Sequence, residues 1–426
     1  GSEMCIRDRF PMRILYVTQL YEPENVAGAF RASDHARAWC ARGHEVTVLT
    51  GWPHYPKGEV FEGYEVDALG EEWCGPVRVL RSRVVARPLT SFVRRIQNGL
   101  GFLWFGALNA VFRKRDFKGP FDVVFGTSGT VFAGWLGFIC ARRFKLPFVV
   151  EFRDLTFEQM VATGSRREGL GVRLMKAAEL SLAKRGDRIV VLTEGFRDIL
   201  AREGIPLSKI SVVPNGADPC PVTRAVSPDV LSFGYFGTLG LSQDIPGTIE
   251  CAARAACVAG REPRYLIIGE GAARGDIEET IGTNRYPFCE LLHGMSKDDL
   301  EKHYATCDMT VVSLRKAEEF ASTIPSKVFQ SLARGIPVLF LGPEGECSRL
   351  VSENRVGVTL TGTPDENDQI LSEFFGSPDW EAELTAMGER ALALMDERYS
   401  RRVLADRVVD VLSDAAGVDP DGRGVS

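Results

Sequence analysis

The sequence predicts an α/β protein with two doubly wound parallel-sheet domains, and three observations support this prediction. The chain has 426 residues, 45% of them hydrophobic and 25% charged, which is more than one ordinary folded domain needs. Strand-like apolar runs alternate with helix-like segments almost throughout, as is typical of parallel sheets flanked by helices. The pattern breaks at residues 218–229, where three prolines in twelve residues indicate an interdomain linker.

The first domain is expected at residues 12–217. It begins with a strand at 13–18, continues with a helix at 32–42 and returns to a strand at 44–50. Further strands are expected at 77–80, 122–125, 148–152, 188–192 and 210–213.

The second domain is expected at residues 230–395, with strands at 231–236, 265–268, 309–313 and 338–341. A last helix is expected at roughly 380–413, and the segment 396–416 is expected to pack back on the first domain. Residues 417–426 are polar and are expected to be disordered. Residues 1–11 resemble a tag and a translated adapter, so we exclude them from the fold.

The net charge of −6 is unevenly distributed. Residues 12–217 contain 29 Lys and Arg against 21 Asp and Glu, whereas the rest of the chain from 218 contains 20 against 34. A basic first half fits a phosphate-bearing ligand or an anionic membrane surface, or is incidental surface charge. The ten cysteines form no CxxC pair, which favours a reducing cytosol, and the five histidines show no metal-ligand spacing.

Residues 99–112 form a 14-residue stretch without charge, between Arg94-Arg95 and the basic run 113–115. As a helix the stretch would be about 21 Å long, shorter than the roughly 30 Å hydrocarbon core of a bilayer. Two interpretations stay open: segment 94–115 lies on an anionic membrane surface, or the helix is buried on the sheet of the first domain.

Four glycine-bearing or helix-opening turns are expected at strand ends, where parallel sheets bind ligands. They lie at 27–31, 236–240, 268–271 and 324–327. Glycine lets backbone N–H groups approach an anion closely, and a helix N-terminus adds partial positive charge. Lys327 would add a full charge beside a diphosphate. Each turn taken singly is also compatible with an ordinary strand-to-helix connection.

A dinucleotide-binding oxidoreductase would need G-x-G-x-x-G directly after the first strand. That strand is instead followed by 19–25, which contains no glycine, and 269–274 has only the first two glycines of the motif. The sequence therefore argues against an oxidoreductase.

Eight segments resemble glycosyltransferase family 4, with the closest likeness to its WbuB-type fucosamine-transferase branch. They occur in the order of the family and are AGAFRA (27–32), ARGHEVTVLTGWPHYPKG (41–58), PFVVEFRDL (147–155), VVLTEGF (190–196), ISVVPNGAD (210–218), YFGTLGLSQ (235–243), LIIGEGA (266–272) and IPSKVFQSLARGIPVLFLGPEGE (324–346). The resemblance implies a GT-B fold, in which two Rossmann-like domains face a cleft. It also implies a retaining transfer from a nucleotide sugar held by the second domain to an acceptor bound by the first.

The resemblance also implies roles for individual residues. The donor-binding set is Gly28, Arg31, Gly237, Thr238, Gly269, Glu270, Gly271, Ser326 and Gln330. Within it, Gln330 would face the ribose, and Lys327 would join Ser326 at the diphosphate and act in catalysis.

Two positions depart from the pattern of the family. The usual Glu-x7-Glu pair is replaced by Ser322 and Gln330, so that an amide would contact the ribose in place of a carboxylate. A common His-Asp pair is replaced by Arg153-Asp154. We expect both as catalytic residues: Arg153 would stabilise phosphate charge, and Asp154 would orient the acceptor or accept its proton. A structural pair at a strand end is the alternative.

His54 and Tyr55 lie on a loop after a strand of the first domain and are candidates for acceptor contact. The one Asp-x-Asp lies in the tail, so we expect no metal and no cofactor, and a donor diphosphate neutralised by Lys, Arg and backbone dipoles.

The function predicted is a hexosyl- or N-acetylhexosaminyltransferase with a UDP-linked donor and a polyprenyl-diphosphate-linked or glycan acceptor in cell-surface polysaccharide (O-antigen) assembly. It would be cytoplasmic or peripheral on the inner face of the bacterial plasma membrane, with no nucleic-acid partner. The alternatives are a nucleotide-sugar 2-epimerase of the same fold and a non-catalytic sugar-nucleotide-binding protein.

Overall fold

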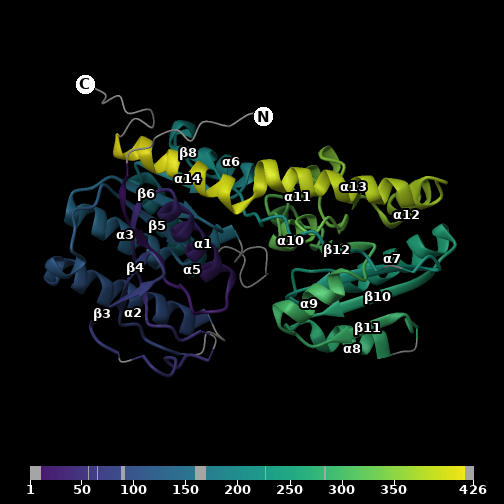
Figure 1. The fold of residues 1–426 in the computed structure, drawn as a ribbon, viewed down its shortest axis with the longest axis horizontal. Coiled ribbons are helices and arrows are strands. Elements are labelled where there is room, and N and C mark those ends of the chain that lie inside the picture. The colour runs from purple at the N-terminus through teal and green to yellow at the C-terminus, as the bar shows by residue number, and fades with distance from the viewer. Residues whose placement is uncertain are drawn as a thin grey trace. The chain divides into compact units, whose positions relative to one another are not determined.

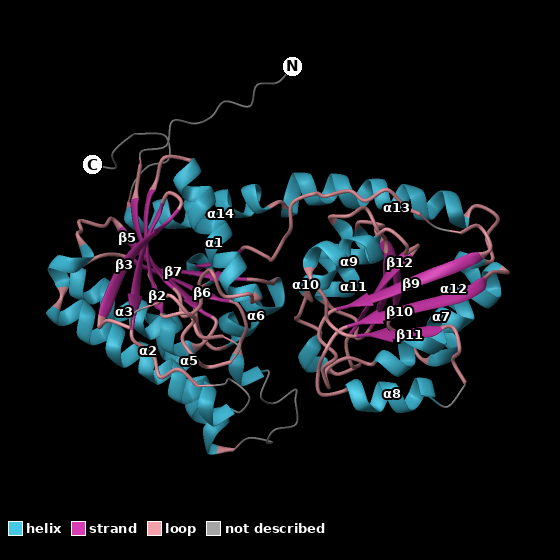
Figure 2. Cartoon of the chain, turned by 60° about the horizontal axis from the view of Figure 1, so that its bottom comes forward, coloured by secondary structure: helices cyan, strands magenta, loops and turns pink. Residues whose placement is uncertain are grey.

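The computed structural model of the protein describes residues 11–55, 57–64, 66–87, 92–158, 169–225, 227–282 and 285–417. They divide into two compact units, seen in Figures 1 and 2. Unit 1 is made of the described residues up to 158, together with 169–214 and 401–417, and unit 2 is made of those from 215 to 400. The tag was expected at 1–11 and the disordered tail at 417–426. Of these residues, 1–10 and 418–426 lie outside the described part of the chain.

Unit 1 is built on an eight-stranded sheet of order β3-β4-β2-β1-β5-β6-β7-β8. All neighbouring strands are parallel except β3 and β4. The strands are β1 (Arg13–Val17), β2 (Glu45–Gly51), β3 (Leu69–Cys74), β4 (Val77–Ser82), β5 (Val123–Ser128), β6 (Phe148–Phe152), β7 (Arg188–Val191) and β8 (Ile210–Val212). The central strands are almost completely buried because helices cover both faces of the sheet, which is why they read as continuous apolar runs.

The helices of unit 1 form a layer on each face of the sheet. They are α1 (Ala27–Ala41), α2 (Phe92–Phe112), α3 (Val131–Phe144), α5 (Leu170–Arg185), α6 (Glu194–Arg202) and α14 (Arg401–Ala416), with short 3₁₀ turns at Lys114–Phe117 and Leu207–Lys209. Helices α1 and α14 share one core cluster with the sheet. On the other face α3 approaches β5 closely because two glycines meet: a Cβ on Gly126 would lie 3.5 Å from the Cα of Gly137.

The C-terminal helix α14 completes the core of unit 1. The indole Nε1–H of Trp39 in α1 donates to the carbonyl oxygen of Ala405 at 3.1 Å, and Arg42 forms an ion pair with Asp406. One continuous helix at 380–413 was the wrong expectation. Helix α13 (Trp380–Leu394) passes into a π turn at Met395–Tyr399, and Ser400 is extended, so that α14 starts as a separate helix.

Unit 2 is built on a six-stranded, wholly parallel sheet of order β11-β10-β9-β12-β13-β14. Its strands are β9 (Val230–Phe236), β10 (Glu262–Ile268), β11 (Cys289–Leu292), β12 (Met309–Ser313), β13 (Val338–Leu341) and β14 (Gly357–Leu360). Its remaining helices are α7 (Ile245–Ala259), α8 (Arg274–Gly282), α9 (Lys297–Tyr304), α10 (Ser326–Leu332), α11 (Glu346–Glu353) and α12 (Pro364–Phe375), with a 3₁₀ turn at Glu318–Phe320. Several start at side-chain caps, such as Thr363, which accepts from the N–H of Glu366.

The boundary between the units lies at Pro214–Asn215. The segment expected as a linker is held against unit 2 by backbone hydrogen bonds: the N–H of Cys220 donates to Ala333 at 2.7 Å, and that of Ala225 donates to Ala305 at 2.8 Å. It is therefore an ordered part of that unit over its described residues.

Candidate functional site

Each sheet has a point where the strand order reverses direction, and parallel sheets bind ligands at the carboxyl ends of the strands beside that point. In unit 1 the chain runs outward from β1 to β2 on one side and later to β5 on the other. In unit 2 it runs from β9 to β10 and later to β12. The segments that follow β9 and β12 are therefore neighbours. The first contains Gly237, and the second leads into α10, which carries Lys327.

Lys327 lies directly on the turn after β9. Its Nζ is 3.9 Å from the ring centroid of Tyr235 and donates to the Tyr235 hydroxyl oxygen and, at 3.2 Å, to the carbonyl oxygen of Thr238. A Cβ on Gly237 would lie 2.6 Å from Cε of Lys327, and the φ of Gly237 is +130°, so glycine is required here for two reasons. The structure thus brings together three of the residues predicted for the donor phosphates and sugar.

The surroundings of Lys327 reduce the fraction of its side chain that is protonated when no ligand is bound. Burial lowers the pKa of its ammonium to about 7, because a desolvated ammonium is destabilised relative to the neutral amine. The partners of Nζ within the unit are a hydroxyl and a carbonyl oxygen. An anion placed here would supply the opposite charge that favours the protonated form.

The turns after β9 and β10 are joined backbone to backbone. The N–H of Gly237 donates to Ile268 at 2.9 Å, and that of Leu239 donates to Glu270 at 2.8 Å. A Cβ on Gly269 would lie 1.9 Å from the carbonyl oxygen of Gly237, and one on Gly271 would lie 2.1 Å from that of Leu239. Close packing of the two turns is therefore sufficient to explain both glycines, and their contact with a nucleotide stays a prediction.

Glu270 projects from this edge and is exposed. Its Oε1 accepts from Nδ1 of His293 at 2.7 Å and from the N–H of Gly294 at 3.3 Å, and these hydrogen bonds lower the pKa of the carboxyl. His293 follows β11 and was missed by sequence reasoning, because a single histidine outside a spacing motif carries no signal.

Ser326 and Gln330 lie on α10. Ser326, the first residue of the helix, is exposed. The Gln330 Oε1 accepts from Nη1 of Arg334 at 3.2 Å, and Nε of Arg334 donates to Glu301 at 2.7 Å. The side-chain oxygen expected at the ribose is thus already a hydrogen-bond acceptor within the unit, and the ribose contact stays a prediction.

In unit 1, Arg31 is bound to a buried carboxylate. Its Nη2 donates to Oε1 of Glu151 at 2.7 Å and its Nη1 to the carbonyl oxygen of Pro214 at 3.1 Å, while Thr127 Oγ1 donates to Glu151 Oε2 at 2.7 Å. Burial by itself would raise the pKa of Glu151. The positive charges nearby, Arg31 first among them, more than offset this effect of burial, so that the pKa of Glu151 is about 2. Sequence reasoning missed Glu151 because it lies inside an apolar strand.

Arg153 and Asp154 follow β6, as predicted for the catalytic pair. A Cβ on Gly28 would lie 2.7 Å from Nη1 of Arg153, so the glycine provides space for this guanidinium. The buried Nε of Arg153 has no hydrogen-bond partner in the described part of the chain, and Asp154 is exposed. The structure therefore brings Gly28 and Arg153 together, with Asp154 next to them.

His54 lies beneath the surface of the loop after β2. It is fully buried, with Nδ1 2.8 Å from the carbonyl oxygen of Trp52 and Nε2 2.6 Å from Nδ2 of Asn98. The N–H groups of His54 and Tyr55 both donate to Oε1 of Glu24 at 3.0 Å. The imidazole thus holds the loop to α2, whereas Tyr55 is half-buried; acceptor contact by either residue stays a prediction.

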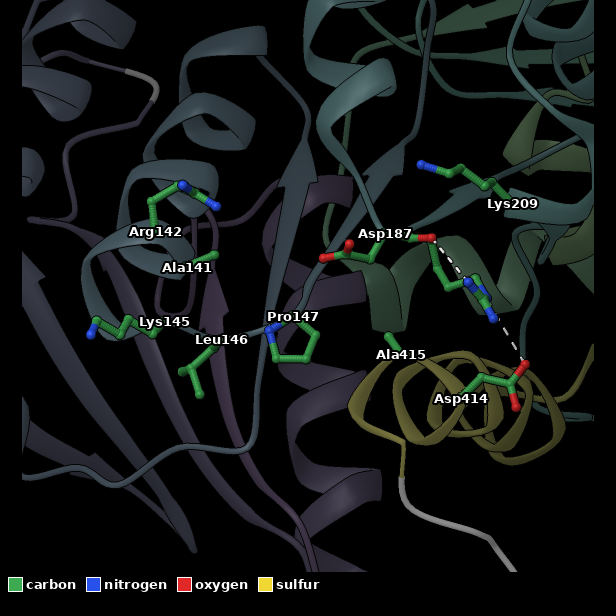
Figure 3. Close-up of a pocket in the computed structure, with 10 residues that line it drawn as sticks. Ala141, Arg142, Lys145, Leu146, Pro147, Asp187, Lys209, Asp414 and Ala415 are labelled. Atoms are coloured by element: carbon green, nitrogen blue, oxygen red, sulfur yellow. Dashed lines mark hydrogen bonds and ion pairs between the residues drawn. The ribbon is translucent and has the colours of Figure 1, made fainter. Parts of the chain in front are cut away.

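A separate pocket lies at the opposite end of the unit 1 sheet, where β6 and β7 begin (Figure 3). It measures about 810 Å³, and its wall includes Arg142, Lys145, Lys209 and the pair Arg188–Asp414, whose nearest atoms are 4.0 Å apart. None of the predicted site residues lines it, because those residues follow the carboxyl ends of strands.

Among the described residues, no cluster of three or more His, Cys, Asp or Glu could hold a metal ion. None of the described helices is long and apolar enough to cross a membrane.

Residues 28–216 match the family model of the glycosyl transferase 4-like domain. Among curated proteins, the chain is 23% identical over 342 residues to WcaI of Escherichia coli (strain K12), named as a candidate colanic acid biosynthesis glycosyl transferase, across 76% of this chain and 82% of WcaI. It is 24% identical to the 2-deoxystreptamine glucosyltransferase of Streptomyces kanamyceticus, across 71% and 84% of the two chains.

Solved structures share the fold of this chain at low sequence identity. Sucrose-phosphate synthase from Thermosynechococcus elongatus matches with a TM-score of 0.67 at 15% identity, over 95% of this chain and 98% of that one. WaaG, described as a glycosyltransferase involved in lipopolysaccharide biosynthesis, matches with 0.62 at 14% identity, over 94% and 99%. Anabaena Alr3699/HepE in complex with UDP-glucose matches with 0.61 at 15% identity, over 95% and 100%.

The predicted α/β, GT-B fold is confirmed by these neighbours and by the two parallel-dominated sheets. The prediction of glycosyltransferase family 4 is supported in its broad form by the domain match and the relatives. The WbuB-type branch stays a prediction.

Proposed function

We propose that this protein is a retaining glycosyltransferase that moves a sugar from a nucleotide diphosphate to an acceptor. The observation that carries the proposal is the position of Lys327 over Gly237 and Thr238, at the point where the strand order of unit 2 reverses. The diphosphate gains negative charge as its bond to the sugar breaks. A lysine that has few partners for its positive charge, beside a turn that requires glycine, can stabilise this developing charge.

The donor proposed is a UDP-linked sugar, and the group transferred a hexose or N-acetylhexosamine. The structural neighbour HepE was solved with UDP-glucose, which supports a uridine nucleotide. Glu270 and the His293 that it binds lie at the carboxyl ends of β10 and β11, beside the position that we propose for the diphosphate. We propose this pair, together with Gln330 of α10, for the nucleoside side of the donor.

In the proposed reaction the bond from the anomeric carbon to the diphosphate oxygen breaks, and a bond from that carbon to the acceptor hydroxyl oxygen forms. Lys327 would stabilise the charge on the departing diphosphate, with Ser326 beside it and Arg153 as a second cation. Asp154, which is exposed, would orient the acceptor hydroxyl or take its proton. No metal is required in this scheme, because positive side chains and backbone dipoles would neutralise the negative charge of the diphosphate.

The acceptor proposed is a lipid-linked or polysaccharide intermediate of cell-surface glycan assembly, such as an O-antigen. The names of two similar proteins, WcaI and WaaG, support this class of acceptor. The name of a third, the 2-deoxystreptamine glucosyltransferase, instead indicates a small aminocyclitol as acceptor. A polyprenyl-diphosphate acceptor is anchored in a membrane. The enzyme would then work in the cytoplasm as a peripheral protein at the inner face of the plasma membrane.

The experiment is a transfer assay with a panel of radiolabelled nucleotide sugars and either lipid extract or soluble acceptors. Radiolabel appearing in acceptor supports the proposal, and the anomeric configuration of the product reports retention. A converted free nucleotide sugar would identify a 2-epimerase instead, and binding without turnover a non-catalytic protein.

Lys327→Ala should lower kcat/KM about tenfold or more while the fold is kept. Lys302→Ala, an exposed lysine on α9 of the same unit, is the matched control. Activity should persist in EDTA. A clear loss of activity in EDTA would contradict the metal-free scheme, and full activity of Lys327→Ala would contradict the diphosphate assignment.

A further inference from the structure

Helix α2 of unit 1 carries a row of exposed apolar side chains along its outer side. The helix lies on the outside of the unit (Figure 2) and spans 21 residues. The exposed side chains follow helical spacing and are Val93, Leu100, Trp104, Leu108, Val111 and Phe112. Trp104 is 64% exposed and Phe112 79%. We call this row the α2 stripe.

The opposite side of α2 already provides the contacts that hold the helix in the fold. Phe102 and Ala110 are fully buried. A Cβ on Gly99 would lie 2.2 Å from the ring of Phe132, and one on Gly106 would lie 2.4 Å from Leu136, so α3 is packed directly against these two glycines. The α2 stripe is therefore apolar surface that the folding of unit 1 does not use, and contiguous exposed apolar surface marks an interaction site.

The charged side chains of α2 and of the three residues that follow it are all basic. Residues 92–115 contain five basic and no acidic side chains, and the basic ones lie at the two ends, at Arg94-Arg95 and at 113–115. All five are exposed. The nearest acid that follows is Asp116, whose carboxylate is 3.9 Å from Arg113. An apolar row with cations at both ends is complementary to a surface that is apolar inside and anionic at its boundary.

A small pocket adjoins the α2 stripe on the side of the sheet edge. It measures about 260 Å³ and is lined by Ala68, Arg83, Phe105, Leu108, Asn109, Phe112 and Arg113. Aromatic and aliphatic walls are thus combined with two guanidinium groups. This combination suits a molecule with an apolar chain and an anionic group, since guanidinium groups bind phosphate well.

We propose that α2 docks the protein on an anionic lipid bilayer, with the helix in the plane of the surface and the α2 stripe inserted between the lipids. The helix does not cross the membrane in this arrangement, because its inner side is bound to α3 and the sheet. Trp104 and Phe112 would reach the boundary between headgroups and acyl chains, where aromatic side chains are favoured. The inference concerns a surface outside the proposed donor and acceptor residues and does not depend on the transfer reaction.

The test is flotation of the full chain with vesicles of phosphatidylcholine that contain 30% phosphatidylglycerol, compared with pure phosphatidylcholine. Wild-type protein should float with the anionic vesicles and much less with the neutral ones, and high salt should weaken binding. The double variant Trp104→Gln/Phe112→Gln should bind the anionic vesicles about tenfold or more weakly, because two large apolar side chains no longer insert. Arg113→Gln/Arg115→Gln should lose the preference for anionic lipid.

Leu207→Gln is the control, since Leu207 is an apolar side chain of unit 1 that is 57% exposed but lies outside α2. This variant should float like the wild type. Brominated acyl chains should quench part of the tryptophan fluorescence in the wild type, and Trp104→Phe should float normally but lose that component.

Wild-type protein that stays in solution with anionic vesicles would overturn the proposal, as would a Trp104→Gln/Phe112→Gln variant that floats unchanged. A stripe buried between two copies would give a dimer on sedimentation and no flotation, which would also overturn it. Transfer to a soluble acceptor is scored separately, so a failure of docking is distinguishable from a failure of the proposed activity.

Discussion

The ammonium of Lys327 lies over the ring of Tyr235 and donates to its hydroxyl oxygen, although the two residues come from different βα segments of unit 2. The Tyr235 hydroxyl donates in turn to the carbonyl oxygen of Thr238 at 2.7 Å. Burial raises the pKa of Tyr235, so the phenol stays protonated and brings no negative charge. The lysine is therefore positioned before any anion binds, which is the arrangement that electrostatic stabilisation of a leaving group requires.

We expect UDP binding to weaken as pH rises above about 7. Burial lowers the pKa of Lys327 to about 7 in the free protein, and a bound diphosphate would raise it, so binding takes up a proton between the two pKa values. Calorimetry at pH 8 in two buffers of different ionisation enthalpy measures this uptake. Lys327→Arg, which stays charged throughout, should show no uptake; equal proton uptake by both proteins would exclude Lys327 as the titrating group.

Gly237→Ala should impair both folding stability and UDP binding. The added Cβ would lie 2.6 Å from Cε of Lys327, and the positive φ is unfavourable for alanine, so we expect a loss of about 1–3 kcal/mol in the free energy of unfolding. Urea denaturation and a UDP titration measure the two effects. Gly275→Ala is the control. That glycine lies in α8, and a Cβ added there would meet no atom within 4 Å apart from its chain neighbours and the backbone of its own helix, so this variant should be neutral or slightly stabilising.

Removing either partner of the Arg31–Glu151 pair should be strongly destabilising. Glu151→Leu leaves a nearly buried guanidinium without its carboxylate, which we expect to cost about 3–5 kcal/mol. The double variant Arg31→Met/Glu151→Leu should lose much less than the sum of the single variants, as a double-mutant cycle in urea would measure. Additive losses would mean that the pair does not act as a unit.

The same pair predicts how stability depends on pH. The pKa of Glu151 is depressed to about 2, below its unfolded value of about 4.3. Its stabilising contribution is therefore complete above the unfolded value and is lost as pH falls towards 2. Thermal denaturation between pH 7 and pH 3 should show a shallower loss of stability in the double variant than in the wild type; parallel profiles would contradict this assignment.

Truncating the core side chain of Leu412 should destabilise unit 1, although it lies near the end of the chain. Leu412 is fully buried in the cluster that α14 shares with α1 and the sheet, so Leu412→Ala should cost about 2–5 kcal/mol. The exposed Arg402→Ala on the same helix is the control and should cost less than about 0.5 kcal/mol. Chemical denaturation followed by circular dichroism measures both. Similar values for the two variants would show that α14 is dispensable for the core.

Sequence patterns predicted the strands of both sheets well where these are buried on both faces, as in β1, β5 and β6. They missed β3, β11 and β14, which all lie at sheet edges. β3 contains two glutamates and a glycine, and β11 and β14 have four residues each, so none of them has a long apolar run. They also missed the extended break at Ser400, because the segments before and after it both have helical periodicity.

Within the candidate site, sequence reasoning found the chemistry-bearing residues at strand ends but not their partners. Gly237 and Lys327 were both predicted, whereas Glu151, the partner of Arg31, was hidden in an apolar strand. His54 was predicted to contact the acceptor. The structure shows its side chain fully buried against Asn98, a packing partner that the sequence pattern did not indicate, and the acceptor contact stays a prediction. Local sequence patterns identify the turns that follow strands. They do not show which of the side chains in those turns are buried by segments that are distant in the sequence.

The sequence by itself determined the α/β class, the alternation of strands and helices, and the glycines and lysine of the βα turns, because these depend on local periodicity and residue chemistry. Only the tertiary structure decided that β12 lies beside β9, which brings Lys327 onto Gly237, and that Glu151 is the partner of Arg31. The physical reason is that strand order and helix docking depend on non-local burial. The pairs concerned are separated by 92 residues for Lys327 and Tyr235 and by 120 for Arg31 and Glu151, far beyond the range of local propensity.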